Sequence, residues 1–309
     1  MSNSAIRAFV ITCGLEKMET SGRASTVLKQ HFDEHRTKLS RSELAVAEYL
    51  VGLPIEVLIF KSAEEIAADA GTSDATVIRT ARRLGFSGLP ELKRICSRTM
   101  ARTLPTSDRL EQRFRGTGSD LPKVAHQMFA TAREILNSTE EQLDDDALAT
   151  AVSLLENADT IWCLGIGTAE VEAKHCAIAL SRTGLRTRCS GASGFTLANE
   201  LLDLRKDDAV ILFNAVHETA EFSLVTSQMA ELGCKLVLVC GVQLGELYRN
   251  KVDALLTCVG SPSKLASWSL GAIVIGDLLA YGVAVKNQPR AVATKRRLAG
   301  LRSKALSPK

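Results

Sequence analysis

The stretch SAEEIAADAGTSDATVIRTARRLGF, residues 62–86, decides the organisation of the N-terminal half of this 309-residue chain. Two short helical patterns flank Gly71, a residue type that tolerates the positive φ of a tight turn. Ser62 has Glu65 three residues later, which is the spacing of a capping box, and Ser73 is placed to cap the second helix. The pattern predicts a helix-turn-helix motif.

The second helix of this motif carries the candidate DNA contacts, because the start of such a helix faces base edges in the major groove. Between Arg79 and Arg115 the chain has ten Lys or Arg and three Asp or Glu. That basic stretch favours DNA binding, although a solvated pair of amphipathic helices would look similar. The residues predicted to bind DNA are Ser73, Asp74, Thr76, Arg79, Thr80, Arg82 and Arg83.

Further helical patterns surround the motif. Ser40 precedes RSELAVAEYL and has Glu43 at the capping-box spacing, which predicts a helix that ends near Gly52. Pro90 opens another helical pattern that continues to about residue 102. The first half of the chain is therefore expected to be entirely helical.

The second half changes to apolar runs of strand length that alternate with helical segments. The expected strands are TIWCLG (160–165), DAVILFN (208–214), KLVLVCG (235–241), ALLTCVG (254–260) and, more weakly, RTRCS (186–190). Such alternation indicates a parallel sheet covered by helices on both faces. The predicted fold class is α + α/β, an all-helical domain followed by a doubly wound five-stranded parallel sheet.

The turns after three of these strands hold the candidate ligand residues. In open parallel sheets, ligands bind beyond the carboxyl ends of the strands, where helix N-termini offer N–H groups. The glycines after the first strand could equally be structural, and His217 beside Glu218 could be a surface pair. The predicted effector-binding residues are Gly165, Gly167, Thr168, Ser190, Asn214, His217 and Thr219.

Charge is distributed unevenly along the chain. Residues 1–115 carry 18 Lys and Arg against 14 Asp and Glu, residues 116–285 carry 12 against 21, and residues 286–309 carry 8 against none. Because residues 1–115 are basic and residues 116–285 are acidic, the N-terminal part is the one expected to bind a polyanion. The basic tail could meet a polyanion too, but a solvated segment is the preferred interpretation.

The cysteine pattern and one long apolar segment indicate whether the chain binds a metal or cofactor and whether it enters a membrane. Eight cysteines form no C-x-x-C pair, so no structural zinc, other metal or cofactor is expected, and reduced thiols fit the cytoplasm. Residues 265–285 are long enough to span a bilayer, but Asp277 lies inside them at a cost of about 2.5–3.5 kcal/mol in lipid. A buried helix and no membrane association are therefore expected.

Both halves together resemble the RpiR family of transcriptional regulators over about residues 38–295. In the first half the resemblance rests on IAADAGTSDATVIRTARRLGFSGLPELK. In the second half it rests on CLGIGTAEVEAKHCAIALSRTGL, LGCKLVLVCG and SLGAIVIGDLLAYGVAV, which resemble the sugar isomerase (SIS) domain. The resemblance implies dimers or tetramers, and control of carbohydrate metabolism genes by a sugar, amino sugar or sugar phosphate.

The residue pattern, the linker-like composition after residue 102 and the charge distribution set the expected domain boundaries. They are a flexible lead-in (1–37), a helix-turn-helix domain (38–102), a linker (103–120), a SIS domain for effector sensing and dimerisation (121–285) and a basic tail (286–309). The family's ligand loops, G-x-G-S-S and S-x-S-G-x-T, are altered. Ala169 replaces a serine, and of the second loop only Thr219 remains, with Glu218 adding negative charge.

Three hypotheses follow for the function. The first is a DNA-binding regulator that is not an enzyme and responds to a small molecule in the SIS domain. The second is a sugar-phosphate isomerase, for which Glu200, His217 and Glu218 are the candidate bases. The third is a regulator whose SIS domain only dimerises.

Overall fold

A computed structural model describes the chain except for residues 1–26, 102–105, 216 and 307–309. It divides into two compact units, which we treat separately. Unit 1 comprises Met1–Ser138 with Gly260–Ser267, and unit 2 comprises Thr139–Val259 with Trp268–Lys309.

All regular secondary structure among the described residues of unit 1 is helical. After a helix over residues 27–35, its elements are η1 (Arg36–Lys38), α2 (Arg41–Gly52), α3 (Ile55–Leu58), α4 (Ala63–Asp69), α5 (Asp74–Arg83), α6 (Leu89–Ala101), α7 (Thr106–Thr117) and most of α8 (Leu121–Glu141). The capping boxes predicted at Ser40 and Ser62 both form, with the serine side chain and the glutamate three residues later exchanging hydrogen bonds with the backbone. These caps fix where α2 and α4 begin.

The limits of unit 1 differ from the predicted domain boundaries. Leu28 and Phe32 are buried in the same core as Val46, Leu50 and Ile66, so residues 27–37 belong to the domain and are not a flexible lead-in. The predicted linker is largely the helix α7. Apolar burial decides both points, because each buried Leu or Phe contributes about 1.5–3 kcal/mol.

Unit 2 is a five-stranded parallel sheet with the strand order β2-β1-β3-β4-β5. Its strands are β1 (Ile161–Gly165), β2 (Thr187–Ser190), β3 (Ala209–Asn214), β4 (Lys235–Gly241) and β5 (Ala254–Cys258). Its helices and turns are α9 (Asp145–Glu156), η2 (Gly167–Ala169), α10 (Glu170–Ser181), α11 (Gly194–Leu201), α12 (Ala220–Leu232), α13 (Val242–Tyr248), α14 (Ser269–Lys286) and α15 (Gln288–Leu306). All five predicted strands are confirmed.

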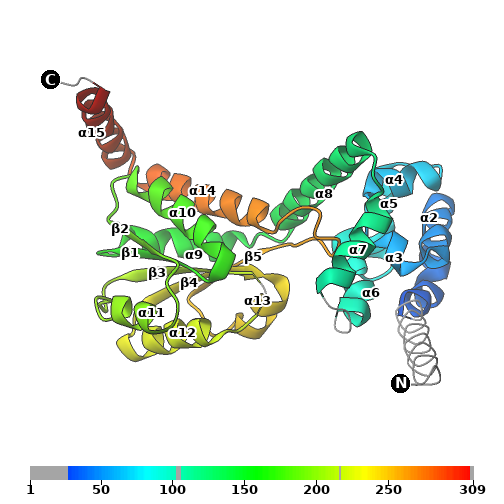
Figure 1. Cartoon of the computed structure of the whole chain (residues 1–309), viewed down its shortest axis with the longest axis horizontal. Helices are drawn as coiled ribbons and strands as arrows, with labels where there is room; N and C mark the ends of the chain where they lie inside the picture. Colours follow the sequence, from blue (N-terminus) through cyan, green and yellow to red (C-terminus); the bar gives the residue numbers. More distant parts are fainter. Residues whose placement is uncertain (1–26, 102–105, 216, 307–309) are drawn as a thin grey trace, which may run out of the picture. The chain divides into compact units, whose positions relative to one another are not determined.

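Helices cover both faces of this sheet (Figure 1). Side chains on one face, such as Ile211 and Phe213, pack into a core with α9, α10 and α14, while Val210 and Leu212 on the other face pack with α11 and α12. Successive residues of a strand point to opposite faces, so every residue of β3 is buried. The doubly wound architecture predicted from the sequence is confirmed.

Two features at the C-terminal end differ from the sequence prediction. The helix expected over residues 265–285 begins at Ser269, and residue Leu265 packs against the core of unit 1. The expected basic tail, residues 286–309, is not a simple solvated tail, because it contains all of α15, which is attached to the rest of unit 2. Arg290 holds both oxygens of Glu156 at 2.9 and 2.6 Å and donates to the Thr183 carbonyl at 3.1 Å.

The apolar helix α14 is long and hydrophobic enough to cross a membrane by composition alone. In unit 2 its buried residues include Ile275, Leu279 and Val283, which pack with α9 and α10. Gly276 lets it approach α10 closely, since a Cβ there would lie 3.3 Å from the Cβ of Cys176. In this structure α14 is thus a core helix of an α/β unit.

Candidate functional site

The helix-turn-helix forms as predicted, from α4, a turn and α5. Gly71 has φ +64°, and no atom lies within 4 Å of the position that a Cβ would occupy. The turn therefore favours glycine because of its left-handed backbone conformation, and not because a side chain would clash. The Thr72 N–H donates to the Ala67 carbonyl at 2.9 Å and closes the end of α4. Ser73 then caps α5 by accepting from the Thr76 N–H.

The faces of α5 are divided between core and solvent. Val77 and Ala81 are fully buried against α2 and α4, and Thr76 and Thr80 lie on the same side with 5% and 0% exposure. The prediction that Thr76 and Thr80 contact DNA is therefore wrong for the folded domain. A helix with 3.6 residues per turn that buries positions 77 and 81 also turns 76 and 80 inward.

The remaining predicted DNA contacts lie on the exposed side of α5 or at its cap. They are Ser73, Asp74, Arg79, Arg82 and Arg83. Half-buried Ile78 lies between them and was not among the predicted contacts, which were all polar or charged. Apolar contacts to a thymine methyl are a normal part of base readout, so Ile78 belongs among the candidates.

Short contacts hold these arginines near the domain surface. Arg79 donates to the Thr76 hydroxyl at 3.0 Å, and Arg82 donates from Nε to the Ser87 carbonyl at 3.4 Å. Arg83 lies 3.9 Å from Glu43. The pKa of Glu43 is lowered mainly by the Ser40 backbone N–H and further by Arg83 and Arg79. The positive field of α5 thus extends to the start of α2.

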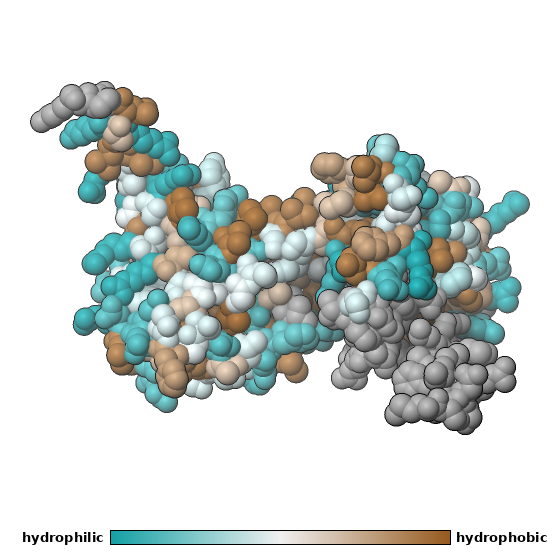
Figure 2. Space-filling view, in the orientation of Figure 1, coloured by the Kyte–Doolittle hydropathy of each residue, from teal (hydrophilic) through white to brown (hydrophobic). Residues whose placement is uncertain are grey.

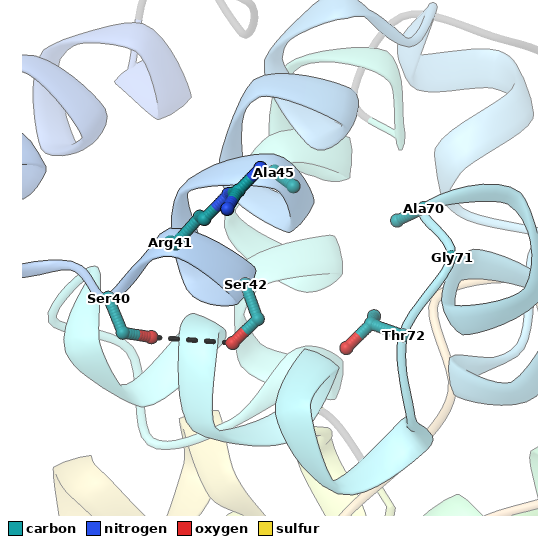
Figure 3. A pocket seen from close by; sticks show the side chains of 7 residues that line it. All are labelled: Ser40, Arg41, Ser42, Ala45, Ala70, Gly71 and Thr72. Atoms are coloured by element: carbon teal, nitrogen blue, oxygen red, sulfur yellow. Dashed lines mark hydrogen bonds between the residues drawn. The ribbon is translucent and has the colours of Figure 1, made fainter.

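An open hollow of about 480 Å³ adjoins the start of α5 (Figure 3). It lies between the first turn of α2 and the turn of the helix-turn-helix. Its lining residues are Ser40, Arg41, Ser42, Ala45, Ala70, Gly71 and Thr72. The hollow offers three hydroxyls, a guanidinium and the N-terminal end of a 12-residue helix, a set of groups that suits an anion.

In unit 2, the three predicted effector loops meet at one edge of the sheet. β1 pairs with β2 on one side and with β3 on the other, all in parallel, so their carboxyl ends point the same way. The loops that begin after residues 165, 190 and 214 therefore lie side by side. The adjacency expected for the first and third loops is confirmed by the strand pairing.

The first loop is held by its glycines. A Cβ on Gly165 would lie 2.2 Å from the Ala169 carbonyl oxygen, and Gly167 has φ +63°. This tight turn leaves Thr168 exposed at the edge, while Ala169 is buried. Of the two predicted glycines, Gly165 has a structural role that the close approach of the backbone explains, and Gly167 lies exposed beside Thr168.

The second and third loops use several of their polar groups internally. The Ser190 hydroxyl accepts from the Ala192 N–H at 3.0 Å, and the Thr219 hydroxyl caps α12 by accepting from the Phe222 N–H at 3.2 Å. Asn214 is 5% exposed and donates to the His217 carbonyl at 2.8 Å. Asn214 therefore shapes the loop, and the exposed imidazole of His217 is the group it presents.

Carboxylates surround this edge. The pKa of Glu221 is lowered by its own backbone N–H, then by the Thr219 hydroxyl and the Gly194 N–H, so a negative charge sits at the start of α12. The pKa of Tyr248 is raised to about 12, mainly by burial and further by a hydrogen bond to Glu218. Glu218 is thereby oriented toward α13, and the edge is acidic.

One buried acid was missed by the sequence reasoning. Glu172, in the first turn of α10, is 1% exposed, and its Oε2 has no hydrogen-bond partner among the residues that the structure describes. It acts electrostatically on Cys258 at the carboxyl end of β5, and burial raises the pKa of that thiol well above its usual range, with Glu172 adding to the rise. The sequence signal was a spacing, since Glu172 lies four and eight residues before Cys176 and Leu180, which are buried on the same side of α10.

The comparisons with known proteins match this architecture. The model of the helix-turn-helix domain of the RpiR family matches residues 26–103. The Bacillus subtilis HTH-type transcriptional regulator YbbH is 28% identical over 244 residues, which are 77% of this chain and 78% of that protein.

Solved structures extend the likeness to unit 2. The sugar isomerase domain of an RpiR transcription factor from Sphaerobacter thermophilus is 25% identical, has a TM-score of 0.53 and covers 59% of this chain and 99% of that one. Vibrio vulnificus NanR, solved with ManNAc-6P, is 17% identical with a TM-score of 0.51 and covers 93% of this chain and 100% of that one.

A helix-turn-helix unit joined to a sheet of the sugar isomerase type defines a two-domain transcriptional regulator. The start of the family match at residue 26 agrees with the burial of Leu28 and Phe32 in unit 1. Residues 26–103 match the helix-turn-helix domain of the RpiR family, and the chain is similar to transcriptional regulators of this type, whose second unit is a SIS domain.

Proposed function

We propose that this regulator acts in the bacterial cytoplasm as a homo-oligomer that binds an operator through α5 and responds to a sugar-related ligand at the β2-β1-β3 edge. The observation that carries the DNA assignment is the exposed face of α5, which presents Arg79 and Arg82, while the hollow lined by Arg41 and Thr72 lies beside the turn that precedes this helix. The α5 face reads bases, while the hollow, through Arg41 and Thr72, receives a backbone phosphate.

Mobility-shift titrations of the full chain with its own promoter region test this proposal. Arg79→Ala should weaken specific binding by about 1–3 kcal/mol. Thr80→Val should leave binding unchanged, because the buried hydroxyl donates to the Thr76 carbonyl and faces the core. Exposed Arg182 in unit 2 supplies a charge-matched control, Arg182→Ala. Equal affinities for wild type and Arg79→Ala would remove α5 as the reading helix.

The ligand is proposed to contact the loops at Thr168, His217 and Thr219. Vibrio vulnificus NanR holds ManNAc-6P, which supports a sugar-related ligand class. The carboxylates of Glu218 and Glu221 disfavour a phosphate dianion in this chain. A neutral or amino sugar is therefore expected to bind more tightly than its phosphorylated form.

Calorimetry with the matched pair ManNAc and ManNAc-6P tests the site and the charge argument together. Thr168→Val should weaken whichever ligand binds, while Thr150→Val on the exposed side of α9 should not. Tight binding of ManNAc-6P alone would show that the charge argument is wrong. Binding undiminished in Thr168→Val would show that the site is elsewhere.

We further propose that the SIS unit does not catalyse isomerisation. Two features support this proposal: Glu218 is engaged by Tyr248, and Glu200 is half-buried on α11, so neither carboxylate is a freely exposed base. A coupled assay with common phosphosugars should show no turnover. Turnover that is abolished by Glu200→Gln or His217→Ala would support the isomerase instead.

The oligomer is proposed to form through the outer side of α10 and α14. Exposed apolar side chains gather there, and Figure 2 shows hydrophobic residues along α14. They are Val171 and Ile178 on α10 and Val274, Tyr281 and Val285 on α14. The His175–Asp277 pair, at 2.8 Å, lies among them. Sedimentation should show a smaller species for Tyr281→Glu, and no change for Leu202→Lys on the opposite layer of unit 2.

A further inference from the structure

Three potential metal ligands lie together on the first described helix of unit 1. His31, Glu34 and His35 occupy positions i, i+3 and i+4 of the helix over residues 27–35, so they share one face. One donor atom of each residue lies within 4.8 Å of the others. The two imidazole rings are stacked, with centroids 6.2 Å apart and planes inclined by 10°.

Both imidazoles are fixed in the same tautomer. His31 Nδ1 lies 2.8 Å from the Leu84 carbonyl oxygen, and His35 Nδ1 lies 2.9 Å from the His31 carbonyl oxygen. A carbonyl oxygen only accepts, so each Nδ1 carries the proton and each Nε2 keeps a lone pair. Metal-binding histidines usually donate their other ring N–H to a carbonyl or carboxylate oxygen in the same way.

The third residue supplies an oxygen ligand. The Glu34 carboxylate accepts a hydrogen bond from the Gln30 amide to Oε1 at 2.9 Å, and one of its oxygens lies within 4.8 Å of a ring nitrogen of each histidine. Two imidazoles with one carboxylate form a donor set that zinc and neighbouring transition metals accept, with a fourth position for water. The sequence H-x-x-E-H places two histidines one helical turn apart, a spacing that zinc enzymes also use.

We propose that His31, Glu34 and His35 bind a divalent transition metal ion such as Zn²⁺. Ligands at zinc distances lie about 3.4 Å apart in a tetrahedral site. Small side-chain rotations in these half-buried and exposed residues bring the donors from within 4.8 Å to that spacing. The expectation of no metal was based on the cysteine pattern and did not consider this triad.

The site would couple metal to the DNA-binding helix. His31 is bonded to Leu84, the C-cap residue of α5, and its ring packs on Phe86 with centroids 4.5 Å apart. A metal that fixes His31 also fixes the helix over residues 27–35 against the end of α5. This role goes beyond the proposed sugar response and is independent of it.

Calorimetry of the reduced, metal-free full chain with ZnCl₂ tests the proposal. Wild type should bind one equivalent that is lost or at least about tenfold weaker in His35→Ala and in Glu34→Gln. His126→Ala and Cys189→Ser, which remove an exposed imidazole and an exposed thiol elsewhere, should bind as wild type does. Zn²⁺ should also raise the melting temperature of wild type and not that of His35→Ala.

Three outcomes would overturn the site. They are an absence of heat with wild type at millimolar ZnCl₂, equal binding by wild type and His35→Ala, and loss of binding in Cys189→Ser alone. The His35 ring bonds to a carbonyl of its own helix, so His35→Ala is expected to fold. A circular dichroism spectrum equal to that of wild type confirms this before titration.

Discussion

Glu134, on α8, links this helix to α4 and α6 in unit 1, and its substitution should lower the stability of unit 1 by a measurable amount. One oxygen accepts from the Ala63 N–H at the start of α4 at 2.6 Å, and the other from Lys93 Nζ on α6 at 3.2 Å. The side chain of Lys93 is 4% exposed and that of Glu134 is 15% exposed. Glu134→Ala would therefore leave a buried ammonium and a helix N–H without a partner.

The expected cost follows from these contacts. Removing one partner of a buried ion pair costs about 3–5 kcal/mol, and an orphaned backbone donor about 1–3 kcal/mol. Partial exposure of Glu134 admits water, so the lower end applies, and we expect about 3 kcal/mol for Glu134→Ala. In the double variant Lys93→Met/Glu134→Ala no buried charge remains, so its cost should fall below the sum of the single costs by about 2 kcal/mol.

Two probes separate the unfolding of the two units in urea. Both tryptophans, Trp162 and Trp268, lie in unit 2, so their fluorescence follows that unit, whereas far-ultraviolet circular dichroism follows the helices of both. Glu134→Ala should shift the circular dichroism transition of unit 1 and leave the fluorescence transition in place.

A matched control stands next to Glu134 on α8. Arg133 pairs with Glu64 on α4 at 2.8 Å, but both side chains are more than half exposed, at 58% and 59%. Arg133→Ala should therefore cost less than about 1 kcal/mol. A similar loss for Arg133→Ala and Glu134→Ala, or additive costs in the double variant, would refute the argument from burial.

Three further predictions concern unit 2. Gly165→Ala should destabilise unit 2 by about 3 kcal/mol, measured as a lower urea midpoint of tryptophan fluorescence, because its Cβ would meet the Ala169 carbonyl. Gly167→Ala has open space around the new Cβ and should cost only about 1 kcal/mol, for its positive φ. Equal costs for the two variants would disprove the steric explanation. Glu172→Leu should stabilise unit 2 by about 1–3 kcal/mol in the same assay, since the change removes a buried acid that has an unpaired oxygen. A loss of stability would instead mean that this acid has a structural partner. Hydrogen bonds from Arg290 to Glu156 and to the Thr183 carbonyl attach α15 to the rest of unit 2, so Arg290→Ala should speed amide hydrogen exchange in α15. The control Arg296→Ala, at an exposed position of the same helix, should not change this exchange. Equal protection of α15 in both variants would show that other contacts hold the helix.

The residue patterns that predicted the fold correctly all act locally. Ser40 with Glu43 and Ser62 with Glu65 form capping boxes wherever a helix begins, because the partners are three residues apart. The apolar run AVILF is compatible with a strand buried on both faces, and it became most of β3 at the centre of the sheet. The resemblance of the motifs to the RpiR family then indicated how these elements are combined.

The candidate sites were less predictable, because exposure depends on neighbours far away in the sequence. Thr76 and Thr80 looked like base-reading residues, yet α2 and α4 cover them. Asn214 looked like a ligand donor, yet the loop it precedes uses its amide. The link between His31 and Leu84 spans 53 positions, so no local pattern could reveal it.

The sequence by itself determined the order of helices and strands, their caps and the family, since these depend on residue type and short spacings. Only the tertiary structure decided which side of α5 faces solvent, that residues 27–37 and α7 belong to the DNA-binding unit, and that Glu134 and Lys93 meet. The physical reason is that burial and pairing energies arise from side chains that folding brings together over long chain separations. The same residues carry no such energy in the extended chain.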